Sequence, residues 1–531
     1  MEWEFEEQSE EMMKMQIEIH YNRSRRAGRR LGSAGAGVLL ALAAGVSWAA
    51  GPGDQLWRFY ADFAVTVVVP IPDLSGNGGK DVIVGSEDDS LYLVEGRGSK
   101  AGNQLWSAPF KSTLSAAVVL PDVNGDGKSD VAGGDAFGLL QVLSGVSGQA
   151  LWKFLAFGTV LSIIPVADAN GDGVGDVAIG SENDSVYCLS GKPPPAGLLG
   201  KALWHFAVPG GKKGPPPPAS SGMPVPKTSS IAAPGPKDRA VGANTLAMLM
   251  QKTGVFGIAV GTSTDTLYCL GLADGIPRWK TGLPGDIWKI AAFPDQDGDG
   301  IDEVLAACGA NAAYLLKGST GEILWSHPVS LGAVTVAVSD DVDGDGRHDA
   351  LIGSGGGQVH CVSGAAKGVN VKSIWTYDFG DTSTILSIAP MGDLNKDGKP
   401  DCAVGTSSNL AAMLDGNGGK AWSVNLGGEV TAVADIGDVD GNGTPDMAAG
   451  TSMGFVSSLF TGGTSSLNSR AYKAKGPLRD ARAAMRREGI GFGIVLDPGP
   501  GPVDFDANGR TRAALKTASI PGLSEDQASR K

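Results

Sequence analysis

The sequence predicts an all-β protein, an eight-bladed β-propeller of four-stranded blades whose ring is closed by the N-terminal strand. A unit of about 46 to 52 residues recurs eight times along the 531-residue chain. Within each unit, four short segments rich in Val, Ile, Leu and Tyr are separated by Gly, Asp and Asn turns, which is typical of strands and hairpins. Four strands at this period fit a propeller blade. A parallel β-helix needs far shorter coils, and helical repeats need a 3.6-residue periodicity that is absent.

The first strand of each unit is an apolar run, such as VTVVVP from Val65, that leads into an acidic loop. The second strand ends in Gly followed by Ser, Thr or Asp, as in DVIVGS. These glycines are Gly85, Gly134, Gly180, Gly261, Gly353, Gly405 and Gly450, with Ala307 at the same place in the fifth unit.

The third strand ends in another Gly about eleven residues later, as in SLYLVEG at Gly96. The fourth strand carries a Trp in every unit. Because this large apolar side chain recurs identically, we expect it to pack between blades and not to stack on a ligand. The eight are Trp57, Trp106, Trp152, Trp204, Trp279, Trp325, Trp375 and Trp422.

The order of segments at the two ends of the repeat predicts how the ring closes. The Trp57 segment precedes the first apolar run, whereas the last unit stops after its third strand near Gly462. We therefore expect the N-terminal strand to complete the last blade, in a propeller that spans residues 54–464. A Pro-rich insertion at 209–240 should form an extended loop, and residues 466–531 are predicted to be a largely disordered tail.

The N-terminus predicts export. Residues 23–50 join a basic run to an apolar stretch that ends in small residues, which is the layout of a secretory signal. We expect residues 1–49 to be a signal peptide with an atypical acidic extension, cleaved after Ala49. The alternative is an uncleaved anchor, because residues 31–50 carry no charge, but their Gly, Ala and Ser content makes a weak span. The expected location is secreted, periplasmic or at the cell surface, with no stable membrane span after cleavage.

The composition restricts the partners. The chain has 43 Lys and Arg against 57 Asp and Glu, a net charge of −14, which argues against a nucleic-acid partner and favours divalent cations. The five Cys are an odd number without a CxxC motif. A disulfide framework or zinc ribbon is therefore not expected, and the Cys side chains should pack as small hydrophobes.

Six loops between first and second strands share a nine-residue pattern with oxygen-bearing side chains at positions 1, 3, 5 and 9 and Gly at position 6. Together with the backbone carbonyl of position 7, they would surround one point with hard oxygen ligands, a set suited to Ca²⁺ and not to zinc or copper. The predicted ligands are Asp122, Asn124, Asp126, Lys128 and Asp130; Asp168, Asn170, Asp172, Val174 and Asp176; Asp295, Asp297, Asp299, Ile301 and Glu303; Asp341, Asp343, Asp345, Arg347 and Asp349; Asp393, Asn395, Asp397, Lys399 and Asp401; and Asp438, Asp440, Asn442, Thr444 and Asp446.

The alternative for each loop is an Asp/Asn/Gly turn without metal, since these residues favour turns on their own. Six recurrences at one place in the repeat favour the metal. An EF-hand is excluded because the loop leads into a strand. The first unit has Ser75 and Asn77 at positions 3 and 5, so binding there is doubtful, and residues 251–254 of the fourth unit cannot bind. We expect about six structural Ca²⁺ sites on one face of the ring.

Two sets of motifs resemble known families. The segment DVNGDGKSDVAGGD from Asp122 resembles the FG-GAP repeat of integrin α-chain propellers and their bacterial relatives. The segment LSGVSGQALWKF around Trp152 is similar to the repeats of quinoprotein alcohol dehydrogenases and of related non-catalytic bacterial propellers. Together these resemblances cover residues 54–464. They imply a propeller fold and Ca²⁺, and both families include many members that only bind or scaffold.

The expected function is therefore a non-catalytic binding or scaffold module for a protein or glycan ligand. One alternative is a pyrroloquinoline quinone-dependent dehydrogenase, which by family resemblance would need a cofactor in the central channel and often an adjacent Cys pair, absent here. The other is a Ca²⁺-dependent carbohydrate-active enzyme, whose acids would be scattered. No catalytic residue is predicted, because the GxSxG string at 450–454 falls at a strand-to-strand turn, not before a helix.

Overall fold

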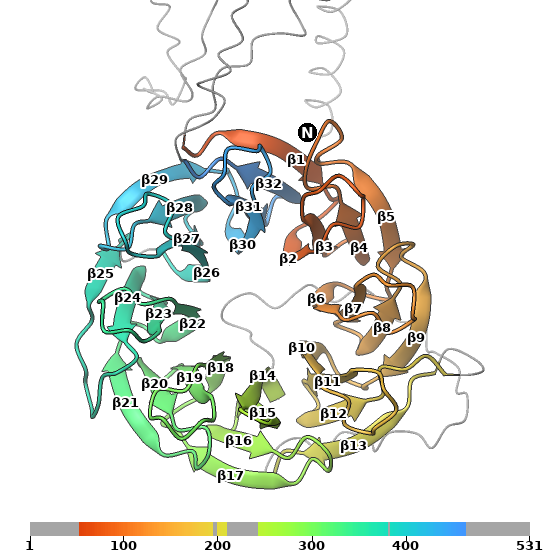
Figure 1. The fold of residues 1–531 in the computed structure, drawn as a ribbon, viewed down its shortest axis with the longest axis horizontal. Coiled ribbons are helices and arrows are strands. Elements are labelled where there is room, and N and C mark those ends of the chain that lie inside the picture. Colours follow the sequence, from red (N-terminus) through yellow and green to blue (C-terminus); the bar gives the residue numbers. More distant parts are fainter. Residues whose placement is uncertain (1–51, 195–198, 210–242, 381–382, 463–531) are drawn as a thin grey trace, which may run out of the picture. The chain divides into compact units, whose positions relative to one another are not determined.

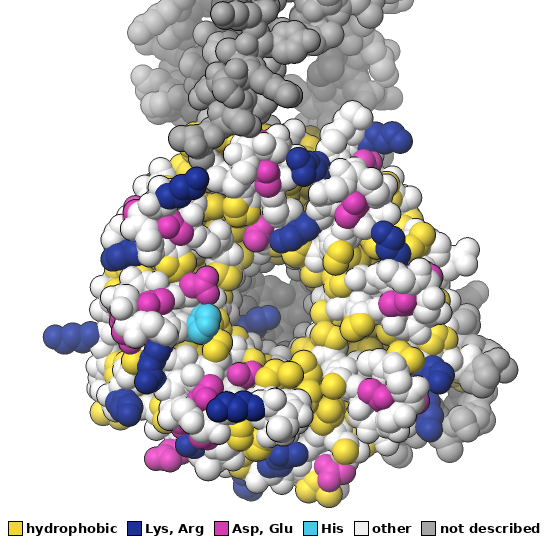
Figure 2. Space-filling model, in the orientation of Figure 1, with side chains coloured by type: hydrophobic (Ala, Val, Ile, Leu, Met, Phe, Trp, Pro, Cys, Tyr) yellow, Lys and Arg dark blue, Asp and Glu magenta, His cyan; other side chains and the backbone are white. Residues whose placement is uncertain are grey.

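A computed structural model describes residues 52–194, 199–209, 243–380 and 383–462. The predicted signal peptide, nearly all of the Pro-rich insertion and the predicted tail lie outside the described residues. The described part forms eight four-stranded antiparallel sheets arranged in a ring, which confirms the predicted eight-bladed propeller (Figure 1). Figure 2 shows a central opening bordered by hydrophobic side chains. The described residues contain no helix long and apolar enough to cross a membrane.

Each blade runs from an inner strand beside the central opening to an outer strand at the periphery (Figure 1). Blade 1 is β2 (Val65–Ile71), β3 (Asp81–Ser86), β4 (Ser90–Val94) and β5 (Gln104–Pro109). Blade 2 is β6 (Leu114–Leu120), β7 (Asp130–Asp135), β8 (Leu139–Leu143) and β9 (Ala150–Leu155). Blade 3 is β10 (Val160–Val166), β11 (Asp176–Ser181), β12 (Ser185–Leu189) and β13 (Ala202–Ala207). Blade 4 is β14 (Ala243–Gln251), β15 (Gly254–Thr262), β16 (Thr266–Leu270) and β17 (Pro277–Gly282).

The second half of the ring repeats this order. Blade 5 is β18 (Ile287–Phe293), β19 (Glu303–Cys308), β20 (Ala312–Leu316) and β21 (Ile323–Pro328). Blade 6 is β22 (Ala333–Ser339), β23 (Asp349–Ser354), β24 (Gln358–Ser363) and β25 (Trp375–Asp378). Blade 7 is β26 (Ile385–Gly392), β27 (Asp401–Thr406), β28 (Leu410–Leu414) and β29 (Lys420–Asn425). Blade 8 is β30 (Val430–Gly437), β31 (Asp446–Thr451), β32 (Phe455–Leu459) and β1 (Gln55–Tyr60).

The ring is closed as predicted, by the N-terminal strand. Strand β1 pairs antiparallel with β32, with Trp57 opposite Ser458 and Phe59 opposite Val456. The last blade therefore combines one strand from the start of the propeller with three from its end.

The hydrophobic core is divided among the seams between blades. The described residues form eight apolar clusters, and each joins two neighbouring blades. In one of them, Val142 and Trp152 of blade 2 pack with Val177 and Tyr187 of blade 3. Because no blade buries its faces alone, the ring is the unit that can be stable.

The recurring Trp packs between blades, as predicted. The Trp152 indole is fully buried, and its Nε1 donates a 2.9 Å hydrogen bond to the Gly191 carbonyl of the next blade. Trp106 bonds Gly145 in the same way at 2.8 Å. The Trp106 indole also packs on a turn glycine. A Cβ on Gly148, whose φ is +68°, would lie 2.7 Å from the indole ring. The five Cys are buried and form no disulfide, consistent with packing.

Candidate metal centre

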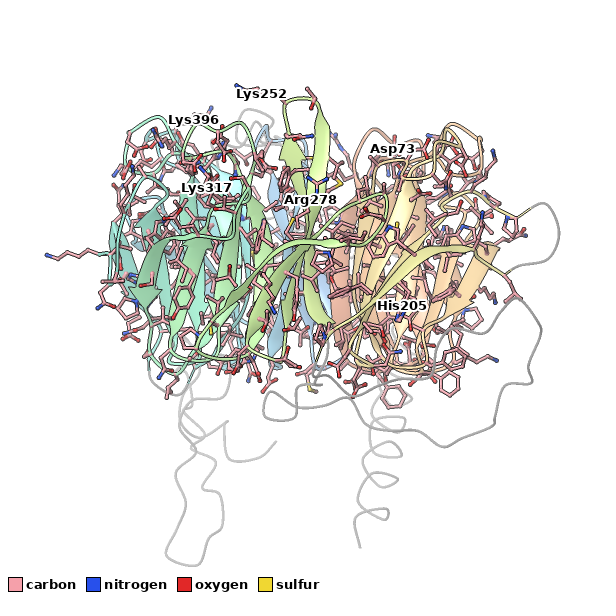
Figure 3. All side chains as sticks on the ribbon, turned by 90° about the horizontal axis from the view of Figure 1, so that it is seen from below. Asp73, His205, Lys252, Arg278, Lys317 and Lys396 are labelled. Atoms are coloured by element: carbon pink, nitrogen blue, oxygen red, sulfur yellow. The ribbon has the colours of Figure 1, made fainter. Side chains whose placement is uncertain are left out.

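The acidic loops connect the first and second strands of their blades and lie on one face of the ring. Figure 3 shows Asp73, Lys252 and Lys396, all from these connections, along one edge of the molecule. The shared pattern produces a shared local geometry, in which positions 1 and 9 hold the loop backbone.

The carboxylate at position 1 accepts hydrogen bonds from backbone N–H groups of its own loop. In the β6–β7 loop, Asp122 Oδ1 accepts the backbone N–H of Gly125 at 2.6 Å, and Oδ2 accepts that of Gly127 at 2.7 Å. These two glycines have φ values of +85° and +81°, which other residues adopt only with strain. The three contacts from Gly127, Gly125 and Asp126 lower the pKa of Asp122 against the opposing effect of its partial desolvation, so the carboxylate is held ionised.

Position 9 is a buried clamp. The Asp130 side chain has no solvent exposure, and its carboxylate accepts the Val123 amide at 2.9 Å and the Gly145 amide at 3.0 Å. These two hydrogen bonds link the loop to Gly145, which lies just after the third strand, β8. Burial raises the pKa of this carboxyl despite the two amides. The same double contact occurs at Asp81, Asp176, Asp349 and Asp401.

The sequence pattern identified position 9 as an oxygen ligand but missed this clamp. The signal that could have found it is the Gly fifteen residues downstream, such as Gly145 after Asp130. A Cβ there would lie 1.9 Å from the Ser129 carbonyl oxygen, so only Gly lets the chain approach closely enough.

Positions 3 and 5 each use one oxygen for the loop backbone. Asp343 Oδ1 accepts the Asp345 amide at 3.1 Å, and Asp345 Oδ1 accepts the Arg347 amide at 2.9 Å. In three loops, three carboxylates each offer an oxygen within 4.8 Å of the others. These groups are Asp295, Asp297 and Asp299; Asp341, Asp343 and Asp349; and Asp438, Asp440 and Asp446.

Loop 438–446 gives the clearest test of whether a cation fits. Asp440 Oδ2 is buried and has no hydrogen-bond partner among the described residues. Burial raises the pKa of Asp440, and the adjoining Asp438 carboxylate raises it further. A buried carboxylate oxygen without a donor, beside a second carboxylate, is costly unless a cation neutralises it. The donor set consists only of oxygens, which suits Ca²⁺.

The Asn-containing loops bring amide groups into the same region. In loop 122–130, Asn124 Oδ1 accepts the Asp126 amide, and Asn124 Nδ2 donates to Asp130 Oδ1 at 3.1 Å. In loop 168–176, Asn170 Nδ2 makes a similar contact with Asp176 at 3.3 Å. In loop 393–401, Asn417 donates to Asp397 Oδ2 at 2.9 Å. In loops 122–130 and 168–176, positions 3 and 9 are therefore in contact, whereas in loop 393–401 position 5 contacts a residue outside the loop.

The first-unit loop, 73–81, is filled by protein donors. Asn77 Nδ2 donates to Glu95 Oε1 at 3.1 Å and to the Arg97 carbonyl at 2.7 Å. Ser75 Oγ donates to Asp81 Oδ1 at 3.2 Å. The Ser75 hydroxyl therefore occupies one oxygen of position 9, and the Asn77 amide nitrogen contacts acceptors outside the loop; weak or absent cation binding here stays a prediction.

The fourth-unit connection is a hairpin turn between β14 and β15, both nine residues long, and it extends above its neighbours at Lys252 (Figure 3). It contacts the next loop: the Asp302 amide donates to the Met250 carbonyl at 3.0 Å, and the Met250 amide donates to Asp302 Oδ2 at 2.9 Å. Blade 4 thus replaces an acidic loop by a hairpin that supports the loop of blade 5.

The GxSxG string belongs to a turn and not to a nucleophile elbow. Gly450 and Thr451 end β31, and Gly454 precedes β32, so a strand follows where a hydrolase would place a helix.

Comparison with known proteins supports the repeat and the propeller fold. Residues 341–404 match the FG-GAP-like repeat, in agreement with the predicted resemblance. The Sqt1 structure from Saccharomyces cerevisiae is similar with a TM-score of 0.57 and 11% identity, covering 77% of this chain and 99% of that one.

The C-terminal WD40 domain of Sif2 has a TM-score of 0.52 and 12% identity, over 78% of this chain and 99% of that one. The computationally designed Ika8 protein has a TM-score of 0.50 and 14% identity, over 77% and 100%. At such identities these structures show the β-propeller fold alone. No curated protein matches the sequence.

Proposed function

We propose that this protein is an exported, calcium-stabilised β-propeller that serves as a non-catalytic binding or scaffold module for a protein or glycan. The observation that carries the calcium assignment is the buried Asp440 oxygen, which lacks a donor and lies beside a second carboxylate in a loop repeated around the ring. The β-propeller fold with its FG-GAP-like repeat supports a scaffold role.

The proposed role of Ca²⁺ is structural. Position 1 orders the loop and position 9 anchors it to two strands, so an ion held between them would link the loop to its blade. Extracellular Ca²⁺ modules bind at roughly 10⁻⁴ to 10⁻³ M, a range in which the ion is loaded outside the cell. Binding to the folded loop alone stabilises the fold by linkage.

The ligand surface is proposed to lie on the face opposite the acidic loops. That face carries the turns between second and third strands and the described connectors between blades, and β13 ends and β14 begins there. The export assignment rests on the basic and apolar pattern of residues 23–50. N-terminal sequencing of the secreted protein should begin at Ala50, and an intact Met1 on a soluble intracellular form would contradict export.

Thermal unfolding of the full chain tests the calcium proposal. We expect Ca²⁺ to raise the Tm relative to EDTA, Mg²⁺ to raise it less, and EDTA to reverse the gain. Asp440→Asn should reduce the calcium-dependent gain, because it removes a charged ligand. The control is Asp435→Asn, an acid whose carboxylate lies 3.6 Å from Lys80 Nζ and outside the ligand positions. Equal Tm values in EDTA and in Ca²⁺ would refute the proposal.

A further inference from the structure

Loop 295–303 differs from the others because a charged side chain enters it from another part of its blade. Lys317 follows β20, and its Nζ lies 2.6 Å from Asp297 Oδ2 and 3.1 Å from Asp299 Oδ2. The side chains of Lys317, Asp297 and Asp299 are 25%, 18% and 25% exposed, so the contact lies at the surface of the loop and is partly shielded from solvent. Figure 3 shows Lys317 beneath the face that carries the acidic loops. The ammonium is therefore the counter-ion of positions 3 and 5.

Every carboxylate oxygen at positions 1, 3, 5 and 9 of this loop has a donor from the protein. The two Asp295 oxygens accept the amides of Gly298 and Gly300, and the two Glu303 oxygens accept those of Gln296 and Asp297. The inner oxygens of positions 3 and 5 accept backbone amides, and the outer ones contact Lys317, with Ser319 Oγ also donating to Asp299. Loop 438–446 contrasts with this, since Asp440 Oδ2 has no donor among the described residues.

The strand register shows which residues occupy the equivalent place in other blades. Val304 pairs with Leu316 in blade 5, and Ala350 pairs with Val362 in blade 6, so Lys317 corresponds to Ser363. Among blades that carry an acidic loop, none of the equivalent residues is cationic except Lys317. The others are Glu95, Ser144, Ser190, Ser363, Asp415 and Phe460.

Ca²⁺ and the Lys317 ammonium would compete for the same carboxylate oxygens. Ca²⁺ binds carboxylate oxygens at 2.3–2.6 Å from one central point. An ammonium that already contacts two of those oxygens occupies this region and repels a second cation. The Lys317 ammonium donates to both carboxylates, so it fills their outer hydrogen-bonding positions. The β14–β15 hairpin also contacts this loop, through two hydrogen bonds between Met250 and Asp302.

We propose that the Lys317 ammonium takes the place of Ca²⁺ in loop 295–303, so that this loop is closed without metal. The remaining metal loops are then 122–130, 168–176, 341–349, 393–401 and 438–446. The expected count of five ions rests on the proposed function, whereas the role of Lys317 is tested by a difference between variants.

The test counts Ca²⁺ bound to the full chain by equilibrium dialysis at ~10 mM Ca²⁺, well above the affinity range of extracellular sites. Lys317→Met should bind one ion more than the wild type. The reciprocal variant Ser363→Lys should bind one ion fewer, because it places an amine beside loop 341–349. The exchange variant with Lys317→Ser and Ser363→Lys should keep the wild-type count. Lys420→Met, at an exposed position of β29, removes one charge and should leave the count unchanged.

Crystals grown with Ca²⁺ locate the change. Density for an ion should appear in loop 295–303 of Lys317→Met and be absent there in the wild type. An unchanged count in Lys317→Met, or an ion in this loop of the wild type, would overturn the inference even if five other loops bind. A wild type that binds no Ca²⁺ would instead refute the calcium proposal, and the Lys317→Met difference would still decide the role of the lysine. If Lys317→Met fails to fold, Ser363→Lys supplies the independent measurement.

Discussion

Single residues explain why the glycines at the ends of the second strands recur. A Cβ on Gly353 would lie 2.6 Å from Ile385 Cγ2, and one on Gly450 would lie 2.6 Å from Val65 Cγ1. In both cases the contact belongs to the inner strand of the next blade. Gly therefore makes room for a branched residue across the seam, and blades pack closely because one partner has no side chain.

Blade 5 solves the same packing problem differently. Ala307 replaces the Gly, and Ala333 stands where the next blade otherwise has Ile385 or Val65; both alanines are fully buried in one cluster. Ala333→Val alone should destabilise the protein by about 1–3 kcal/mol through overpacking. Adding Ala307→Gly should recover most of that loss, because it recreates the Gly and branched pair of the other seams. Urea unfolding of both single variants and the double variant measures the coupling, and additive effects would contradict it.

At the scale of the element, loop 341–349 has two kinds of carboxylate. Asp349 at position 9 is buried and holds backbone amides, whereas Asp345 at position 5 is exposed and uses only one oxygen for the loop. In loop 341–349, Asp349 accepts the Val342 amide at 2.7 Å and the Gly364 amide at 3.1 Å, and burial raises its pKa to about 6. Asp349 thus holds the loop conformation and also belongs to the candidate cation group, whereas Asp345 is a predicted ligand that accepts one amide within the loop.

Two substitutions separate these roles. In EDTA, Asp349→Ala should destabilise the protein by about 3 kcal/mol, because it leaves two buried N–H groups without acceptors. Asp345→Ala removes an exposed side chain and should have little effect in EDTA, but it should reduce the stabilisation by Ca²⁺. Urea midpoints with and without Ca²⁺ measure both effects. If Asp345→Ala matched Asp349→Ala in EDTA, the division between clamp and ligand would be wrong.

At the scale of the whole molecule, stability depends on a ring that is closed without a covalent link. The closure consists of the β1–β32 pairing and of Trp57 and Phe59, which are buried in the seam between blades 8 and 1. Loss of this strand would expose an edge of blade 8 and open the seam on both sides.

Deletion of residues 54–60 should therefore cost roughly 5 kcal/mol or more, since truncating one buried aromatic costs about 3–5 kcal/mol. The matched variant begins at residue 61 and carries residues 55–60 after Leu459, joined by a copy of the 144–149 turn of blade 2. It should regain a Tm close to that of a reference spanning residues 52–462. Failure of the relocated strand to restore cooperative unfolding would show that closure depends on more than this strand.

The sequence alone could predict the number of blades, the order of strands and the closing strand, because each of these features follows from a local sequence pattern that recurs. The Trp, the strand-end glycines and the Asp, Asn and Gly loops are visible without knowing what they touch. The membership of positions 1, 3, 5 and 9 in one loop could also be predicted, since nine consecutive residues must lie together.

The amine in loop 295–303 could not be predicted in this way. Lys317 lies 14 residues after Glu303, and nothing in its own segment, AAYLLKG, distinguishes a solvated lysine from a counter-ion of the acidic loop. The clamp at position 9 and the support from Met250 are equally invisible. All three depend on which strand end lies beside which loop, and that proximity exists only once the blades have paired and packed. Periodic features follow from local preference, whereas the balance of charge in each loop is a property of the packed ring.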